Sequence, residues 1–272
     1  MKLYRTARGA VLEREGAFVR LAEDWDALIN HPSLLAHLRS AARGPAAPRL
    51  DEPVLAPVAG QEVWGAGVTY DRSRSARLEE SQAAGGASFY GKVYDAERPE
   101  LFSKCAGWRV RGPGEAVRVR RDSRWSVPEP ELALCVNARG EIVGYTIGDD
   151  LSARDIEAEN PLYLPQAKTY DGSCAIGPAL LVREAPLPPE TPIALRIVRA
   201  GAPAFEGTTT LARMRRTPES LVAYLYRETS FPAGCVLMTG TGIVPPADFA
   251  LRPGDRIEIE VPAIGTLANP VE

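Results

Sequence analysis

The stretch from Pro128 to Pro178 decides the predicted fold, and it reads PEPELALCVNARGEIVGYTIGDDLSARDIEAENPLYLPQAKTYDGSCAIGP. Its ELALCV segment alternates along the chain as a strand does, and the Asn-Ala-Arg-Gly sequence at residues 137–140 predicts a hairpin turn. IVGYTI then returns as a second strand that ends at Asp149 and Asp150. The stretch therefore predicts an antiparallel hairpin within a β-rich fold.

Three carboxylates of this hairpin are placed to meet at one end of the sheet. Glu129 and Glu131 stand two residues apart, so in a strand both side chains point to the same face. The antiparallel return brings Asp150 back beside the start of the first strand. Three carboxylate groups suit an octahedral site for Mg²⁺ or a similar hard cation. The alternative interpretation is that all three are solvated charges at strand ends.

The basic residues are strongly biased toward arginine. Of the 32 basic residues 28 are Arg, and the only lysines are Lys2, Lys92, Lys104 and Lys168. Surface charge in such a chain is usually supplied by Arg, and a lysine can become a base where its environment lowers its pKa. Lys168, in PQAKTYDG, and Lys104, in PELFSKCAG, are therefore candidates for chemistry. The alternative is that both are chance surface residues.

The composition excludes several classes of protein. A net charge of −3 does not indicate binding to nucleic acid or to an anionic membrane. The N-terminal residues lack the apolar core of a secretory signal, and no apolar run approaches the roughly 20 residues of a membrane span. Both histidines lie far from the carboxylates in sequence, which disfavours a zinc site. The four cysteines lack C-x-x-C spacing and indicate reduced thiols in the cytoplasm: Cys105, Cys135, Cys174 and Cys235.

A boundary between two domains is predicted near residue 60. Residues 2–21 have the pattern of short strands, and a helical pattern follows over residues 24–42. Residues 44–60 carry a proline every few positions and indicate a linker. We therefore expect a small N-terminal α+β domain with its linker over residues 1–60 and a second domain over residues 61–272.

Three further segments bear on a site. The charged residues 71–82 predict a helix that either closes over a cavity or lies on the surface. Ser152 and Asp155 form the S-x-x-D pattern of a capping box, which predicts a helix start there and an end before Asn160. The Thr-Gly-Thr-Gly sequence at residues 239–242 follows an apolar strand and is either a ligand-binding turn or a plain tight turn.

The segments EPELAL, GYTIGDDLSARDIEAEN, LPQAKTYDGSCAIGP and TGTG together resemble the fumarylacetoacetate hydrolase superfamily, from about Val63 to the C-terminal end. VYDAERPELFSK, ENPLYLPQAK and RMRR resemble its branch of 2-keto-3-deoxy sugar acid dehydratases. The resemblance implies a β-rich α+β fold, in which a mixed β-roll follows a small N-terminal α+β domain. It also implies a homo-oligomer, either a dimer or a tetramer, and a divalent cation, usually Mg²⁺, with Mn²⁺ or Ca²⁺ as alternatives.

The resemblance also assigns roles to positions of this chain. The family's E-x-E and following Asp fall on Glu129, Glu131 and Asp150, which would hold the cation. The family's lysine falls on Lys168, and a glutamate of the dehydratase branch falls on Glu100, so these two would be catalytic. The residues that would bind substrate are Thr241, Gly240, Lys104 and Tyr90.

One departure from the hydrolases favours an elimination reaction. Where they carry a histidine that activates water, GVTYDRSR places Ser73. The implied reaction is dehydration of a 2-keto-3-deoxy-pentonate, with 2-keto-3-deoxy-D-arabinonate as first candidate, to 2,5-dioxopentanoate in pentose catabolism. Lys168, with a pKa lowered by the nearby cation, would remove the C3 proton and Glu100 would protonate the departing hydroxyl, or the two would exchange these roles. The alternatives are an acylpyruvate or fumarylacetoacetate-type C–C hydrolase, an oxaloacetate-type decarboxylase and a catalytically silent sensor of 2-keto acids.

Overall fold

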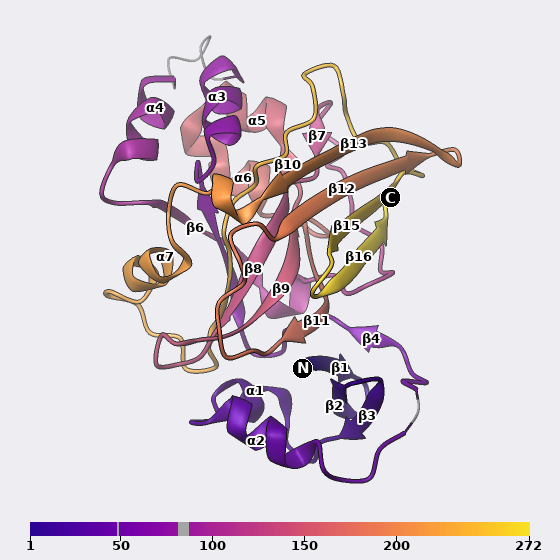
Figure 1. The fold of residues 1–272 in the computed structure, drawn as a ribbon. Coiled ribbons are helices and arrows are strands. Elements are labelled where there is room, and N and C mark those ends of the chain that lie inside the picture. Colours follow the sequence, from indigo (N-terminus) through magenta and orange to yellow (C-terminus); the bar gives the residue numbers. More distant parts are fainter. Residues whose placement is uncertain (48, 81–86) are drawn as a thin grey trace.

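A large mixed sheet forms the frame of the molecule, which is described from a computed structural model over residues 1–47, 49–80 and 87–272 (Figure 1). Its strand order is β3-β2-β1-β11-β9-β8-β14-β5-β6, and β4 pairs with β1. Strands β14 and β5 run parallel, whereas their other neighbours are antiparallel. The strands are β1 Lys2–Thr6, β2 Gly9–Arg14, β3 Ala17–Arg20, β4 Val54–Leu55, β5 Glu62–Gly67, β6 Glu100–Ala106, β8 Pro130–Val136, β9 Ile142–Asp150, β11 Cys174–Leu181 and β14 Cys235–Met238.

A second sheet packs beside the first and encloses the main core. Its order is β13-β12-β15-β16, and its strands are β12 Pro192–Arg199, β13 Ala202–Thr210, β15 Arg256–Val261 and β16 Gly265–Pro270. Alternating residues of β12 and β15 are buried, so one face of this sheet meets apolar residues of β8 and β9. Helix α7, Pro218–Leu225, adds Leu221, Val222 and Leu225 to the same core. The predicted β-rich α+β class is confirmed.

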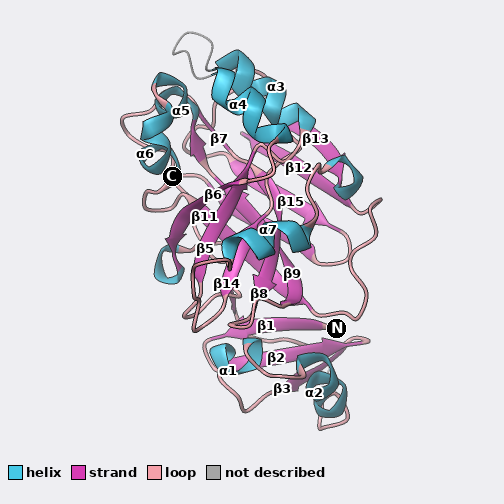
Figure 2. Cartoon of the chain, turned by 90° about the vertical axis from the view of Figure 1, so that its left-hand side faces the viewer, coloured by secondary structure: helices cyan, strands magenta, loops and turns pink. Residues whose placement is uncertain are grey.

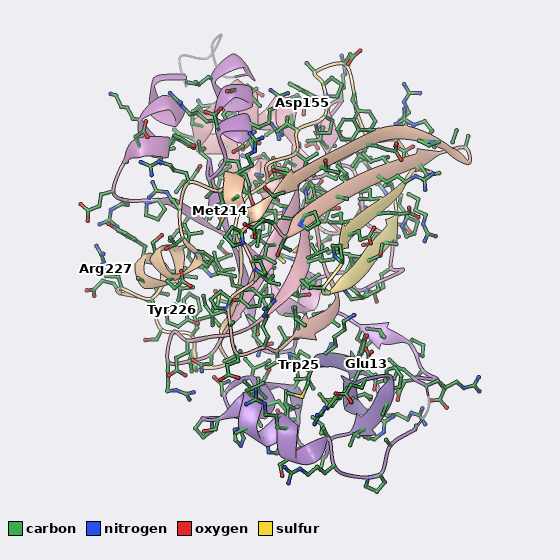
Figure 3. All side chains as sticks on the ribbon, in the orientation of Figure 1. Glu13, Trp25, Asp155, Met214, Tyr226 and Arg227 are labelled. Carbon is green, nitrogen blue, oxygen red and sulfur yellow. The ribbon has the colours of Figure 1, made fainter. Side chains whose placement is uncertain are left out.

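The N-terminal region has its own apolar core. Strands β1, β2 and β3 pack against helices α1, Trp25–Ile29, and α2, Leu34–Ala41. The single helix predicted over residues 24–42 is thus two helices, because Pro32 disfavours helical backbone at the residue before it. Trp25, labelled in Figure 3, is buried in this region. Strand β1 also pairs with β11, so the main sheet continues into the N-terminal region.

The remaining helices gather at one end of the sheet, opposite α1 and α2 (Figures 1 and 2). They are α3 Asp71–Glu80, α4 Ala87–Asp95, α5 Arg154–Glu159 and α6 Leu164–Lys168. A two-stranded sheet of β7, Ser126–Val127, and β10, Ser152–Ala153, lies beside them. None of the described helices has the length and apolar character that crossing a bilayer requires.

The predicted hairpin is present as β8 and β9, with Pro130 opposite Asp149. Helix α5 ends before Asn160 as predicted, but the capping box was wrong. Ser152 lies in β10, and its hydroxyl accepts a hydrogen bond from Lys168 Nζ instead of capping the helix. Asp155, labelled in Figure 3, accepts from the Ser123 hydroxyl and from the Ile156 amide, whereas a capping box would have it accept from the Ser152 amide.

Candidate active site

The two ends of the β8–β9 hairpin bring three carboxylates together. One oxygen each from Glu129, Glu131 and Asp150 lies within 4.8 Å of the others, and all three side chains are buried. The Asp150 amide donates to the Glu129 carbonyl oxygen at 3.0 Å, which fixes the ends of the two strands side by side. The convergence predicted from the sequence is therefore present, and burial excludes the solvated-charge interpretation.

Glu131 is the least compensated carboxylate of the trio. Its Oε2 accepts a hydrogen bond from the Gly240 amide at 2.5 Å, and among the described residues it forms no ion pair. Burial and the neighbouring charges of Asp150 and Glu129 raise the pKa of Glu131 well above its usual range. Gly240 has a φ of +92°, and a Cβ there would lie 2.0 Å from Thr69 Oγ1, so the turn requires glycine.

Glu129 is surrounded by positive charge. Its Oε1 accepts from Arg77 Nη2 at 3.0 Å and from Arg154 Nη2 at 2.7 Å, and its Oε2 accepts from Lys168 Nζ at 2.6 Å. Burial alone would raise the pKa of Glu129, but the three cations outweigh burial and lower it below its usual range. Arg77 also pairs with the buried Glu157 of α5.

Lys168 ends α6 and is 2% exposed. Its Nζ donates to Glu129, to Asp150 Oδ2 at 3.0 Å and to Ser152 Oγ at 2.6 Å. Burial would lower the pKa of Lys168, but the charges of Asp150 and Glu129 raise it above its usual range. This direction applies to the site without a cation, so the lowered pKa expected for Lys168 beside a bound cation stays a prediction.

Lys104 lies outside the cavity and contacts the residues that form it. Its Nζ lies 2.5 Å from Asp150 Oδ1 and donates to the carbonyl oxygens of Leu151 and Lys168. These contacts fix one cation ligand and the end of α6. Lys104 is 0% exposed and does not line the cavity, so the structure does not place it where it was predicted to bind substrate.

One cavity collects most of the predicted residues. Glu100, Thr241, Gly240 and Lys168 line it together with the three carboxylates. Other side chains on its wall are Ser73, Arg77, Phe102, Glu157 and Leu164. Glu100 lies against Gly67, where a Cβ would come within 1.9 Å of Glu100 Oε2. Burial raises the pKa of Glu100 and the charge of Arg77 opposes the rise. Tyr90 belongs to α4, but its side chain lies outside the described residues.

Three residues of the site were not anticipated from the sequence: Arg77, Arg154 and Glu157. The interpretation of arginine as surface charge concealed the first two, which are 8% and 2% exposed. A signal was available for two of the three, because Arg154 and Glu157 stand three apart in SARDIEAEN and so lie on one side of a short helix.

The charge balance of the site suits a divalent cation. Among the described residues, the charged side chains at the site include two more acidic groups than basic ones. The acidic residues are Glu100, Glu129, Glu131, Asp149, Asp150 and Glu157, and the basic residues are Arg77, Lys104, Arg154 and Lys168. Burial raises the pKa of Asp149 as it does that of Glu131. The excess of acidic side chains and the three convergent carboxylates together form a donor set for a hard, oxygen-binding cation, which would favour their ionised forms.

Comparison with known proteins agrees with this geometry. Residues 80–272 match the family profile described as "Fumarylacetoacetate (FAA) hydrolase C-terminal". The chain belongs to this family. A 2-dehydro-3-deoxy-D-arabinonate dehydratase of Saccharolobus solfataricus is 48% identical over 221 residues, which are 80% of this chain and 74% of that protein. A "probable 2-keto-3-deoxyxylonate dehydratase" of Haloferax volcanii is 46% identical over 223 residues, 82% of this chain and 76% of that one.

A solved structure of the same family extends the likeness to the whole fold. It is described as "2-keto-3-deoxy-D-arabinonate dehydratase complexed with magnesium and 2,5-dioxopentanoate". The two structures superpose with a TM-score of 0.84 at 38% identity, over 100% of this chain and 99% of that one. The β-roll and the family membership predicted from the sequence are confirmed.

Proposed function

We propose that the chain is a cation-dependent hydro-lyase that converts 2-keto-3-deoxy-D-arabinonate to 2,5-dioxopentanoate. The observation that carries the proposal is the buried trio of Glu129, Glu131 and Asp150 in one cavity with Lys168 and Glu100. The activities named for the two relatives and the ligands of the solved structure support it. Such a reaction belongs to pentose catabolism.

If the xylonate in the second relative's name is the D form, the substrate names of the two relatives describe one compound. A 2-keto-3-deoxy acid has lost the stereocentres at C2 and C3, and these are the centres at which D-arabinonate and D-xylonate differ. Only the C4 centre remains, and the two D-sugars share its configuration. The stereochemical choice left to this site is therefore between C4 epimers, and we propose the D form.

Glu129, Glu131 and Asp150 would hold the cation, for which Mg²⁺ is the first choice and Mn²⁺ or Ca²⁺ are alternatives. When bound, a divalent cation supplies Lewis-acid chemistry that acidifies the proton next to a ketone, and it offsets the carboxylate charge that keeps Lys168 protonated. The Gly240 amide and Lys104 fix two of the ligands from outside the trio. This arrangement pre-orders the ligands before substrate arrives.

Proton transfer is assigned to the two side chains that flank the carboxylates. Lys168 Nζ would take the C3 proton, and Glu100, whose raised pKa keeps a proton available, would release the C4 hydroxyl as water. The product then has a double bond between C3 and C4. Tautomerisation moves hydrogen from C5 and its hydroxyl to C3 and C4, which leaves the C5 aldehyde. Thr241, at the Gly240 turn, would bind the substrate carboxylate.

Ser73 favours elimination over hydrolysis. Its hydroxyl donates to the Tyr70 carbonyl oxygen at 2.8 Å and lines the cavity where hydrolases of the family carry histidine. A serine held in this way is no base for water at neutral pH. C–C bond hydrolysis therefore lacks its water-activating group here.

The wider setting completes the proposal. We propose a cytoplasmic protein, because all four cysteines are free and buried. We also propose a homo-oligomer, a dimer or a tetramer, which rests on the family resemblance. The division into residues 1–60 and 61–272 stays a prediction, supported by the separate apolar core of the N-terminal region.

The test is turnover of 2-keto-3-deoxy-D-arabinonate by the chelator-treated chain, with and without added Mg²⁺. Formation of 2,5-dioxopentanoate is followed by coupling to an aldehyde dehydrogenase specific for it. We expect product only with Mg²⁺, and a slower rate for the C4 epimer. Lys168→Met should reduce kcat by about 100-fold, because general acid–base groups typically contribute about 10²–10⁴-fold.

Lys92→Met is the matched control, since Lys92 is an exposed lysine of α4. Its activity should equal that of the unmodified chain. Cleavage of an acylpyruvate in a parallel assay, with no dehydration, would replace the proposal by a hydrolase. Equal turnover after removal of divalent ions would exclude the cation from the reaction.

A further inference from the structure

Glu129 differs from the other two carboxylates of the trio in the cations that contact it. Two guanidinium groups and one ammonium group lie within 3.0 Å of its oxygens, from Arg77, Arg154 and Lys168. Glu131 has no ion pair among the described residues, and Asp150 pairs with two lysines. A divalent cation that binds this trio therefore shares Glu129 with positively charged side chains that already contact it.

These cations approach Glu129 from two sides. Arg154 and Lys168 lie on α5 and α6, which follow Asp150 in the chain. Arg77 comes instead from α3 and lines the cavity, whereas Arg154 is not among the lining residues. Arg77 also pairs with Glu157, which lines the cavity from α5. Arg77 is thus the guanidinium group on the side where cation and substrate would meet.

Burial makes the Arg77 contact energetically important. Arg77 is 8% exposed, Glu129 is 5% exposed and Glu157 is 3% exposed, so solvent screens their charges poorly. Arg154 and Lys168 are enough to orient Glu129, because they contact both of its oxygens. Arg77 adds a further positive charge to an oxygen that Arg154 already contacts. This charge attracts Glu129 and repels a divalent cation bound to the same carboxylate.

From these contacts we propose that Arg77 is a positioning residue that competes with the divalent cation for Glu129. Its guanidinium partly replaces the cation's charge at Glu129, and Glu157 holds it in place. Arg77 thereby sets the cation affinity of the trio and links cation binding to helix α3. This inference rests on the proposed cation site, but its test does not depend on catalysis.

The experiment is titration of the chelator-treated, full-length chain with MgCl₂ by isothermal titration calorimetry. Arg77→Gln should lower the Kd for Mg²⁺ by about tenfold, which corresponds to about 1.4 kcal/mol. A residue that only supports the structure would weaken cation binding or leave it unchanged when removed. A tighter Kd thus distinguishes competition from plain support. Arg77→Lys keeps the charge and should return the Kd to within about threefold of the original.

Glu157→Gln provides a change of opposite sign. It removes a negative charge from the cluster and frees Arg77 to interact more strongly with Glu129, so the Kd for Mg²⁺ should rise severalfold. Should Arg77→Gln fail to fold, this variant decides the matter, because an unchanged or lower Kd for Glu157→Gln overturns the proposal. An unchanged or higher Kd for a folded Arg77→Gln overturns it as well.

Arg74→Gln is the matched control on the same helix. Arg74 is a partly exposed residue 3.6 Å from Asp71 and stacks over Tyr94. Its replacement should leave the Kd for Mg²⁺ unchanged. A shift equal to that of Arg77→Gln would show that any lost charge on α3 has the same effect, which overturns the specific role of Arg77. If the unmodified chain does not turn over 2-keto-3-deoxy-D-arabinonate but the Kd values for Mg²⁺ change as predicted, the proposed reaction is contradicted and the role of Arg77 stands.

Discussion

The two ends of the molecule bury side chains to the same depth but with opposite chemistry. In the N-terminal region Leu28 and Leu38 are 0% exposed and pack among apolar neighbours. At the cavity end Lys104, Asp150 and Lys168 are at most 2% exposed. Burying an apolar side chain stabilises a protein by about 1.5–3 kcal/mol, whereas burying charge costs several kcal/mol per ion before pairing offsets it. The cavity end is therefore built for chemistry at the expense of stability, and the N-terminal end is built for stability.

The strongest way to test this contrast is Glu131→Gln. We expect kcat/KM to fall by about 10³-fold, which is about 4 kcal/mol of barrier, because one ligand of the cation is lost. The same change should raise the Tm by about 2–4 °C, if relief of carboxylate repulsion is worth about 1 kcal/mol. Turnover and differential scanning calorimetry measure the two effects. Glu141→Gln, at an exposed carboxylate of the same hairpin, should change neither.

A lower Tm for Glu131→Gln would contradict the claim that buried charge at the cavity end costs stability, since it would mean that this carboxylate stabilises the fold. The Gly240 amide can still donate to a glutamine carbonyl oxygen, so loss of that hydrogen bond would not explain such a fall.

Glu100→Gln should have a smaller effect, with its own pH signature. Burial raises the pKa of Glu100, and a general acid acts only while protonated. Activity should therefore decline as the pH rises through this pKa. Glu100→Gln should reduce kcat by about 100-fold and remove this decline from the pH profile. A profile of unchanged shape would assign the alkaline limb to another group.

Leu28→Ala should have the smallest effect on catalysis. The loss of a fully buried leucine is expected to lower the free energy of unfolding by about 2–5 kcal/mol, measured by urea denaturation. For the fraction that remains folded, kcat should stay within about twofold, because this core lies at the end of the sheet away from the cavity. A folded variant with lost kcat would show that the N-terminal region shapes the active site. Leu35→Ala, at a partly buried position of α2, should cost less stability.

Local pattern was enough to predict the frame of the fold and the cation ligands. The alternation in ELALCV and the turn at residues 137–140 fix the β8–β9 pairing, and this pairing alone brings Glu129 and Asp150 together. The capping box at Ser152 failed because the serine hydroxyl is bonded to Lys168, a residue 16 positions away. Local signals cannot include such a partner.

Contacts from distant segments account for the rest of what was missed. Arg77 reaches Glu129 across 52 positions of sequence, and no periodicity relates the two. The raised pKa of Lys168 in the site without a cation was missed for the same reason. Sequence shows that a lysine is near the motif, but not that Glu129 and Asp150 both contact its Nζ. A pKa depends on the positions of neighbouring charges in three dimensions, and local sequence does not give those positions.

The pairing of β1 with β11 has a consequence for how the protein stays dispersed. Strand β11 is bonded to β9 on one side and to β1 on the other, through the register of Lys2 with Leu181 and Leu3 with Leu180. Without β1, the end of β11 at Leu180 and Leu181 would present unpaired N–H and C=O groups, which are a template for strands of another chain. A chain truncated before residue 21 is therefore expected to aggregate rather than to lose its cavity. We therefore expect the first strand to protect the chain from uncontrolled self-association.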